Sequence, residues 1–327
     1  MFLAMPGDEN DRRPVEACDK HHTICADCYN EYRERCEGNC PTCGHDLKSK
    51  LVVNNTIMKL IEKGVRVLDI PVSDIVIQKD RISKGKFGKV YMAKWGTNNV
   101  VIKVITVDTE EEKQDVKCEA HLTHCLKHPN VVKLFGVTWV KDKKLGLVLE
   151  LAEHGSLDLW IGKTDHEKAR KIALGIVDGL KYVHSQHVIH RDIKPQNILM
   201  FGPENDMIPK IADFGVSKVI HTVRMTHTSV GQQFYMAPEV RMYEPYSFPV
   251  DIFSLAMTLF EMFSEQPILP KSEVFQLVMS ASMRNEFGEI PEKCKVPGYL
   301  RDIIILGWDK KPEKRPSLFE YQATLKG

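Results

Sequence analysis

The chain has 327 residues, of which 43% are hydrophobic and 27% are charged, and its 45 lysines and arginines nearly cancel its 44 aspartates and glutamates. This length allows about two domains, and the balanced charge gives no reason to expect a nucleic acid or a membrane surface as a partner. No apolar run can cross a bilayer and the apolar start has no basic flank, so we expect no secretory signal and a cytoplasmic location.

Residues 18–48 are rich in cysteine and histidine and poor in apolar residues. We expect a polar leader at 1–17 and a small zinc-binding module at 18–48, where a metal replaces the missing core. In a reducing compartment such a cysteine cluster binds metal more often than it forms disulfides, and Cys-x2-Cys steps let two sulfurs bind one tetrahedral ion. A loose cysteine-rich tail is the alternative. The candidate zinc ligands are Cys18, His22, Cys25, Cys28, Cys40 and Cys43.

This spacing, which ends in Cys-Pro-x-Cys, resembles the last six ligands of a RING finger. The resemblance implies one complete site made of Cys18, His22 (or His21), Cys40 and Cys43. It assigns Cys25 and Cys28 to a second site, for which two upstream cysteines are absent. A single ribbon-like site made of Cys25, Cys28, Cys40 and Cys43 is the alternative. A full RING finger implies a ubiquitin-conjugating enzyme as partner and ubiquitin ligase activity.

The next region, 49–74, is predicted to be a helix at 55–63 followed by a linker. From residue 75, short β-type runs are broken by glycine or asparagine, then a polar helical stretch covers 110–127 and strand-like runs cover 131–140 and 145–151. After Gly155 the chain is mostly helical. Strands first and helices later predict an α+β fold with two segregated lobes over 75–323. The later helices are expected at 167–187, 249–263, 271–281, 298–307 and 316–325.

Two features of the strand-rich part suit phosphate binding. Gly85 and Gly88 lie between β-type runs, so they are predicted to form a hairpin turn whose backbone amides can approach a phosphate closely. Lys103 lies in an apolar run, where its ammonium needs a carboxylate to position it, and Glu119 in the following helical stretch can supply one. A hairpin without a ligand and a lysine that faces solvent are the alternatives.

A polar loop at 190–197 carries groups for proton and phosphoryl chemistry. The Asp192 carboxylate can accept a proton from an incoming hydroxyl, and Lys194 can neutralise charge on the moving group. The amide oxygen of Asn197 can hold magnesium, which prefers oxygen ligands. Asp213, sixteen residues after Asn197, is the candidate for a second magnesium ligand.

The order and spacing of these motifs over about 75–323 resemble the protein kinase signature. The resemblance implies a bilobal fold with a small, mainly β N-lobe and a larger, mainly α C-lobe, with ATP and Mg²⁺ as cofactors and proteins as substrates. It implies that Asp251 anchors the catalytic loop and that Arg315 is the partner of Glu239. The motifs are Gly85/Gly88, Lys103, Glu119, His190-Arg191-Asp192, Asn197, Asp213-Phe214-Gly215 and Ala237-Pro238-Glu239.

The resemblance also implies roles for single residues. Lys103, held by Glu119, contacts the α- and β-phosphates. Lys194 favours a kinase of the serine/threonine type, and the overall resemblance is to the tyrosine-kinase-like group. The backbone from Glu150 to Ala152 is the expected hinge for adenine. The residues expected to contact the adenine ring are Val90, Val101 and Leu199.

Control by phosphorylation is expected in the segment between Asp213 and Glu239. Arg191 can pair with a phosphate there and order the segment. Gln232 stands where serine/threonine kinases have threonine, which leaves dual specificity open. A pseudokinase scaffold and a ubiquitin ligase are the alternative functions. The candidate regulatory residues are Thr222, Thr226, Thr228 and Ser229.

Overall fold

The computed structural model describes residues 14–18, 23–25, 47–53, 67–85, 88–186, 188–214, 234–242, 246–265, 290 and 294–327. Several predictions fall outside these residues: the polar leader up to residue 13, the zinc ligands other than Cys18 and Cys25, and the helices at 55–63 and 271–281. The four candidate regulatory hydroxyls and Gln232 also lie outside them.

The first described residues form a three-stranded antiparallel sheet in the order β2-β1-β3. Pro14 of β1 pairs with Cys25 of β2, so Cys18 and Cys25 lie at opposite ends of this strand pair. At about 3.3 Å per residue, four residues along β1 correspond to about 13 Å. The strands are β1 Pro14–Cys18, β2 Thr23–Cys25 and β3 Leu47–Val53.

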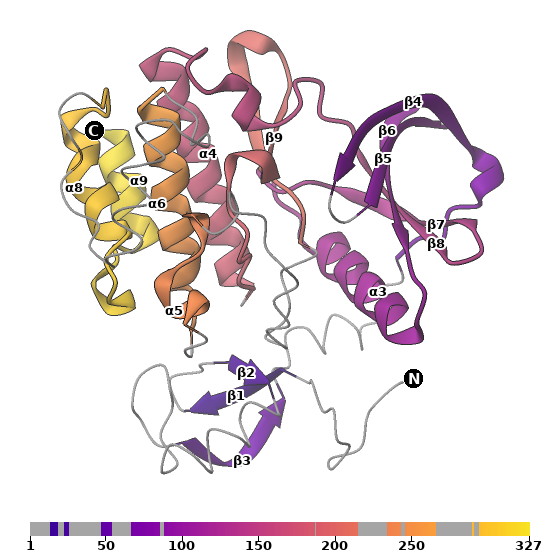
Figure 1. The fold of residues 1–327 in the computed structure, drawn as a ribbon, viewed down its shortest axis with the longest axis horizontal. Helices are drawn as coiled ribbons and strands as arrows, with labels where there is room; N and C mark the ends of the chain where they lie inside the picture. Colours follow the sequence, from indigo (N-terminus) through magenta and orange to yellow (C-terminus); the bar gives the residue numbers. More distant parts are fainter. Residues whose placement is uncertain are drawn as a thin grey trace.

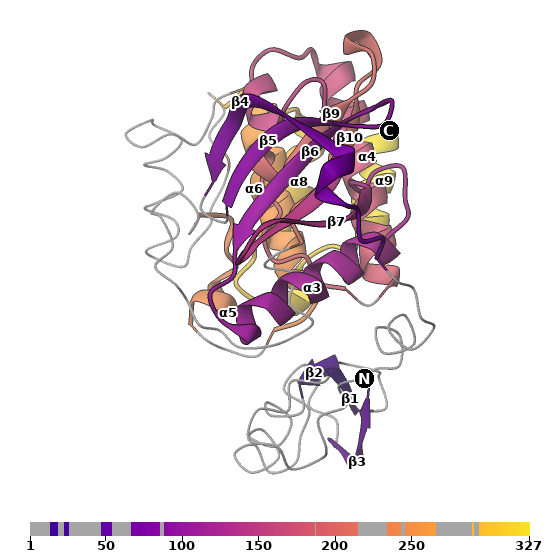
Figure 2. The same ribbon diagram turned by 90° about the vertical axis from the view of Figure 1, so that its right-hand side faces the viewer.

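A five-stranded antiparallel sheet in the order β4-β5-β6-β8-β7 is the centre of the smaller lobe, the N-lobe. It is strongly curled (Figure 2). In β6 the β-branched residues Val100, Ile102 and Val104 alternate inward, as expected for a strand with one buried face. Lys103 therefore lies on the other face. The strands are β4 Ile75–Gly85, β5 Gly88–Trp95, β6 Asn98–Thr106, β7 Leu134–Lys141 and β8 Lys144–Glu150.

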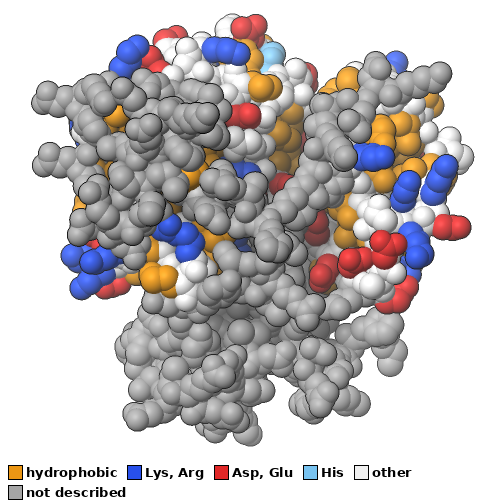
Figure 3. Space-filling model, viewed as in Figure 1, with side chains coloured by type: hydrophobic (Ala, Val, Ile, Leu, Met, Phe, Trp, Pro, Cys, Tyr) orange, Lys and Arg blue, Asp and Glu red, His pale blue; other side chains and the backbone are white. Residues whose placement is uncertain are grey.

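Helix α3, Glu110–Cys125, packs against β7 and β8. It begins with a capping box, in which the Thr109 and Glu112 side chains each bond to the backbone N–H of the other. Val116 and Ala120 face the sheet and are buried, whereas acidic side chains gather on the outer side of the lobe over this helix (Figure 3). Val116 and Ala120 belong to the cluster under the sheet, whereas Leu122 of the same helix is buried in the core of the larger lobe.

The larger lobe, the C-lobe, consists mainly of helices (Figure 1). All residues of α6 from 250 to 263 are buried, and α4 buries one face with apolar residues at helical spacing, such as Ile172, Ile176, Leu180 and Val183. The helices are α4 His166–Ser185, α5 Pro238–Arg241, α6 Pro249–Phe263, α8 Gly298–Gly307 and α9 Leu318–Lys326.

From residue 75 onward, the predicted order of strands and helices is confirmed wherever the structure describes it. Strand β1, which begins in the expected leader, and strand β3, which runs into the expected helix-and-linker region, were not predicted. The helix expected at 249–263 spans Pro249–Phe263, and that at 316–325 starts at Leu318, after a capping box between Ser317 and Glu320. A hairpin of β9, Ile198–Phe201, and β10, Ile208–Ile211, was not predicted, because four-residue strands leave a weak periodic signal. Of the described helices, none is long and apolar enough to cross a membrane.

Candidate active site

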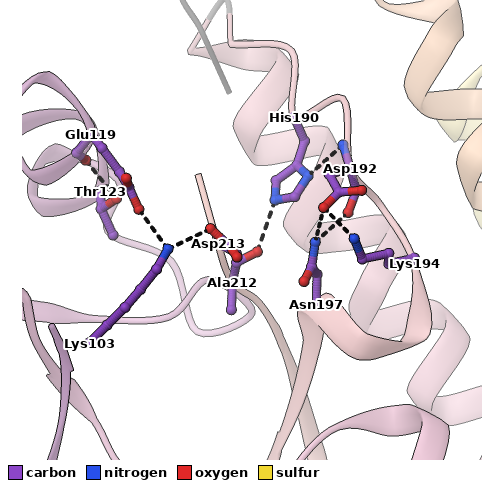
Figure 4. A network of polar contacts seen from close by, with 9 residues as sticks. All are labelled: Lys103, Glu119, Thr123, His190, Asp192, Lys194, Asn197, Ala212 and Asp213. Atoms are coloured by element: carbon purple, nitrogen blue, oxygen red, sulfur yellow. Dashed lines mark hydrogen bonds and ion pairs between the residues drawn. The ribbon is translucent and has the colours of Figure 1, made fainter. Parts of the chain in front are cut away.

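Lys103 is held between two carboxylates. Its Nζ lies 3.2 Å from Oε1 of Glu119 on α3 and 2.8 Å from Oδ1 of Asp213 (Figure 4). Burial opposes the charge of Lys103, but the adjacent carboxylates of Asp213 and Glu119 outweigh it and raise the pKa of the ammonium. The structure thus brings together the lysine and the carboxylate that the sequence pattern paired, with Asp213 as a third member.

The loop after α4 gathers a second charged cluster around Asp192. Lys194 Nζ lies 2.5 Å from Oδ2 of Asp192, and Asn197 Nδ2 donates to the same oxygen and to the backbone oxygen of Asp192, both at 2.7 Å (Figure 4). The short 3-10 helix Pro195–Asn197 turns the asparagine back toward the aspartate. These bonds use the amide nitrogen of Asn197, which leaves its amide oxygen for another partner.

Asp251 on α6 holds the backbone of this loop. Its carboxylate accepts from the N–H groups of His190 and Arg191, each at 2.7 Å, and from Nε2 of His184 at 2.8 Å. Burial by itself raises the pKa of the Asp251 carboxyl, but the bond from His184 and its neighbours' charges outweigh burial and lower that pKa. Arg191 adopts φ 68°, a conformation that costs a non-glycine residue energy, and the two bonds to Asp251 hold the loop in it.

Asp213 is positioned by the same loop. The Ala212 N–H donates to the backbone oxygen of Asn197 at 2.9 Å, which places Asp213 next to the magnesium candidate Asn197. His190 Nδ1 accepts from the Asp192 N–H at 3.3 Å, so Nε2 carries the proton and donates to the Ala212 oxygen at 3.0 Å. Burial lowers the pKa of the His190 imidazole, which keeps this ring neutral. Asp213 has φ 64°, a second strained residue at this site.

Glu239 and Arg315 form a bidentate pair away from the charged clusters. Nη1 of Arg315 lies 2.5 Å from Oε1 of Glu239, and Nη2 lies 2.8 Å from Oε2. The Arg315 side chain is fully buried, and it also donates to the backbone oxygens of Pro249 and Asp309. The pairing that the resemblance implied is therefore present, and it ties α5 to the segment before α9.

The residues expected around a nucleotide lie on the N-lobe sheet and its exit. Gly85 pairs with Gly88 across the tip of the β4–β5 hairpin, as predicted. Val90 pairs with Lys103, and Val101 pairs with Leu149. The Glu150 carboxylate accepts from the Lys133 N–H at 2.8 Å and pairs with Lys210 Nζ at 2.7 Å. Because these two contacts engage the Glu150 side chain, a ligand at this position is expected to contact the backbone of Glu150 instead.

The apolar residues at the sheet exit share one cluster. Leu149, Ala152 and Leu199 are partly buried against a core that includes Ala212, next to Asp213. Each keeps part of its surface exposed, as do Val90 and Val101. The structure thus places the predicted adenine contacts on the same side as the charged clusters.

Two polar contacts of this region were missed by the sequence interpretation. His184 supports Asp251, and Tyr235 donates from its hydroxyl to the buried carboxylate of Glu261. Burial and the Glu261 charge raise the pKa of the Tyr235 phenol well above its ordinary value, so it stays a donor. The partners are far apart in sequence, so no local pattern indicates either contact.

The structure has the features of the protein kinase fold, a class of bilobal proteins. One lobe is a curled sheet with a single helix and the other is helical. A lysine–carboxylate cluster lies opposite a loop that carries aspartate, lysine and asparagine. The chain belongs to the protein kinase family, whose domain, described as "Protein kinase domain", matches residues 76–324.

Similar proteins carry the same domain within longer chains. Serine/threonine-protein kinase VIK of Arabidopsis thaliana is 32% identical over 257 residues, 75% of this chain and 58% of that protein. RGS domain-containing serine/threonine-protein kinase A of Dictyostelium discoideum is 31% identical over 84% of this chain and 24% of its own length. Serine/threonine-protein kinase 10 of Homo sapiens is 33% identical over 72% of this chain and 25% of its own length. The chain therefore spans less than two thirds of these relatives.

Proposed function

We propose that this protein transfers the γ-phosphoryl group of ATP to serine or threonine hydroxyls of proteins. The observation that carries the proposal is the pair of charged clusters, Lys103–Glu119–Asp213 and Asp192–Lys194–Asn197, which the backbone bond from the Ala212 N–H to the Asn197 oxygen holds side by side. Every charged group that phosphoryl transfer requires is present, which favours an active enzyme over a pseudokinase scaffold.

The residues of the chain have separate tasks in this reaction. The Lys103 ammonium, held in place by Glu119, binds the α- and β-phosphates, and the backbone amides at Gly85 and Gly88 approach the phosphates from the hairpin. The Asp192 carboxylate accepts the proton of the substrate hydroxyl, and Lys194, 2.5 Å from that carboxylate, stabilises the negative charge on the transferred group. Catalysis then consists mainly of positioning and electrostatic stabilisation.

The donor set fits magnesium. Asp213 supplies a carboxylate and Asn197 an amide oxygen, the oxygen ligands that this ion prefers, and the Ala212–Asn197 backbone bond keeps the two residues adjacent. When bound with ATP, the ion neutralises phosphate charge. Val90, Val101 and Leu199 retain exposed apolar surface that suits the adenine ring, and the backbone at Glu150 and Ala152 offers its polar groups.

The substrate class follows from two observations. Lys194 occupies the position next to the proton acceptor that is typical of serine/threonine kinases, and the similar proteins of Arabidopsis and human carry that name. The test is to incubate the full chain with ATP and Mg²⁺ and to locate phosphate by mass spectrometry. We expect phosphoserine or phosphothreonine on the chain or on added substrate peptides. Phosphotyrosine alone would contradict the proposed substrate class. The absence of phosphate from both the chain and the peptides would contradict the proposed activity.

We also propose that phosphorylation of Thr226 or Thr228 activates the enzyme. Nε and Nη2 of Arg191 are buried and bond to no polar atom of the described residues, while the guanidinium stacks on Tyr246 at 5.1 Å. A cation in this state is a ready partner for a phosphate. Thr222 and Ser229 are further candidates in the same segment.

Replacing Thr226 and Thr228 together with alanine is expected to lower peptide phosphorylation about tenfold, within the usual range of such couplings. Steady-state rates on a serine peptide measure the effect. Arg191→Met is the matched control: if the phosphate acts through this guanidinium, the alanine pair changes nothing in that background. Equal rates with and without the two threonines disprove the proposal.

For the N-terminal residues we propose one bound zinc ion. The supporting observation is the paired cysteine spacing. The register of β1 and β2 separates Cys18 from Cys25 by the length of the strand pair. Two ligands of one tetrahedral ion lie within about 4 Å of each other. In neither of the two arrangements considered do Cys18 and Cys25 bind the same ion.

Metal analysis of the purified chain is expected to find about one zinc per molecule, since only one complete ligand set is present. Cys40→Ser is expected to remove it, whereas Cys294→Ser, at a buried cysteine of the C-lobe, keeps it. Loss of zinc from Cys18→Ser supports the RING-like site, and retention supports the ribbon-like site. A chain without zinc contradicts both.

The zinc-binding module also bears on two further proposals, a ubiquitin-conjugating enzyme as partner and the cytoplasm as the compartment. A RING-type site makes a ubiquitin-conjugating enzyme a partner, and the absence of ubiquitin chains with a panel of such enzymes rules ligase activity out. We propose the cytoplasm as the compartment, because reduced cysteines are needed for the zinc site.

A further inference from the structure

A short segment ahead of β4 is bound to the edge of the N-lobe sheet. The Ile70 N–H donates to the Val137 oxygen at 2.8 Å, and the Val137 N–H donates to the Leu68 oxygen at 2.9 Å. Asp69 and Val137 pair in parallel. Strand β7 is the last strand of the sheet on this side. Segment 67–70 therefore binds the edge strand as an added extended peptide does.

Gly136 in β7 makes this close approach possible. A Cβ at position 136 would lie 2.3 Å from the backbone oxygen of Leu68 and 2.9 Å from Cδ1 of Ile70. Its φ is not among the positive values of the described glycines, so backbone conformation does not require glycine here. The reason for glycine is the segment that lies against it.

The two ends of the segment enter different apolar clusters. Ile70 is 1% exposed and packs in the cluster that contains Ile102 and Val148. Val67 packs against the cluster that contains Leu147 of β8 together with Val116 and Ala120 of α3. Because neighbouring residues of β8 point to opposite faces, Ile70 and Val67 hold the segment on both faces of the sheet.

Val67 therefore contacts the group of side chains that holds α3 to the sheet. Ala120 directly follows Glu119 in α3, and Val116 lies one turn before it, so their packing sets the position of the Glu119 carboxylate. That carboxylate lies 3.2 Å from Lys103 Nζ. A displacement of α3 away from the sheet lengthens this contact, and small displacements of a positioning group are costly.

We infer that segment 67–70 is a positioning element for phosphoryl transfer, which acts through α3 and Glu119 on the ammonium of Lys103. This inference rests on the proposed kinase activity. Residues 1–66 are joined to the kinase domain through this segment, so an event that pulls it from β7, such as metal loss or partner binding at the N-terminal residues, lowers the rate without touching the catalytic loop.

The test compares two valines of the same stretch in the full chain. Val67→Ala removes the contact with the α3 cluster, whereas Val72→Ala changes a residue that is 45% exposed. We expect Val67→Ala to lower kcat about tenfold, because small displacements of a positioning group are costly, with little change in the KM for ATP. Val72→Ala is expected to leave both constants unchanged. Gly136→Ala, which expels the segment from the β7 side, is expected to behave as Val67→Ala.

A double-mutant cycle separates positioning from general destabilisation. If Val67 acts through Glu119, Val67→Ala loses its effect on kcat in a Glu119→Gln background. The same fold loss in both backgrounds, or no loss in the wild-type background, overturns the inference.

Hydrogen exchange of the α3 amides gives a readout that needs no activity. Exchange is expected to accelerate across residues 110–125 in Val67→Ala and Gly136→Ala and to stay unchanged in Val72→Ala. Unchanged exchange in all three variants overturns the inference. The measurement is made without ATP, so it tests the position of α3 even in a chain that transfers no phosphate. A failure of this inference can therefore be distinguished from a failure of the proposed kinase activity.

Discussion

Replacing Asp192 with asparagine is expected to reduce kcat by about a hundredfold to ten-thousandfold, the usual contribution of a general base. Asparagine has the same shape but cannot accept the hydroxyl proton. Its side-chain oxygen can still accept from Lys194 and Asn197, whose bonds to Asp192 are 2.5 and 2.7 Å, so the loop is expected to stay folded. The KM for ATP is expected to change little, because the role proposed for Asp192 involves the substrate hydroxyl and not the nucleotide.

The measurement is a steady-state assay with ATP, Mg²⁺ and a serine peptide, alongside a thermal unfolding scan of each variant. Asp206→Asn, at an exposed residue between β9 and β10, makes the same chemical change and is expected to keep full activity. Equal rates for Asp192→Asn and Asp206→Asn would assign proton transfer to another group. Loss of rate together with a collapsed unfolding transition would instead indicate a structural role.

Replacing Glu239 with glutamine is expected to lower the free energy of unfolding by about 3–5 kcal/mol, the cost of leaving one charge of a buried pair uncompensated. Arg315 contributes two nitrogens to two carboxylate oxygens at 2.5 and 2.8 Å, and its side chain is fully buried. Glutamine keeps the shape but removes the negative charge, so the guanidinium is left charged and out of reach of water. Urea unfolding followed by tryptophan fluorescence measures the loss.

Glu110→Gln is the matched control, because Glu110 also pairs with a cation, Lys113 at 3.0 Å, but has an 88% exposed side chain. Its expected cost is below about 0.5 kcal/mol. Adding Arg315→Met to Glu239→Gln is expected to restore part of the lost stability, since the orphaned charge is then removed as well. If Glu239→Gln and Glu110→Gln cost the same, the buried pair does not stabilise the C-lobe.

Much of the candidate site could be predicted because its groups are close in sequence. Asp192, Lys194 and Asn197 lie within six residues of one another, so the loop geometry that brings them together is local. The start of α3 after Thr109 agrees with the prediction, and the start of α9 after Ser317 differs from it by two residues; a capping box marks both. The β9–β10 hairpin was missed because its strands are too short for their alternation to stand out.

The sequence by itself determined the family of this protein, the order of its catalytic groups and the succession of the longer strands and helices from residue 75 onward, because each depends on short motifs and on local hydrophobic periodicity. Only the tertiary structure decided the support of Asp251 by His184 and the place of segment 67–70 on β7. It also showed that Gly136 is needed for a close backbone approach rather than for a turn. These contacts join residues far apart in the chain, and packing, which no local pattern encodes, selects them.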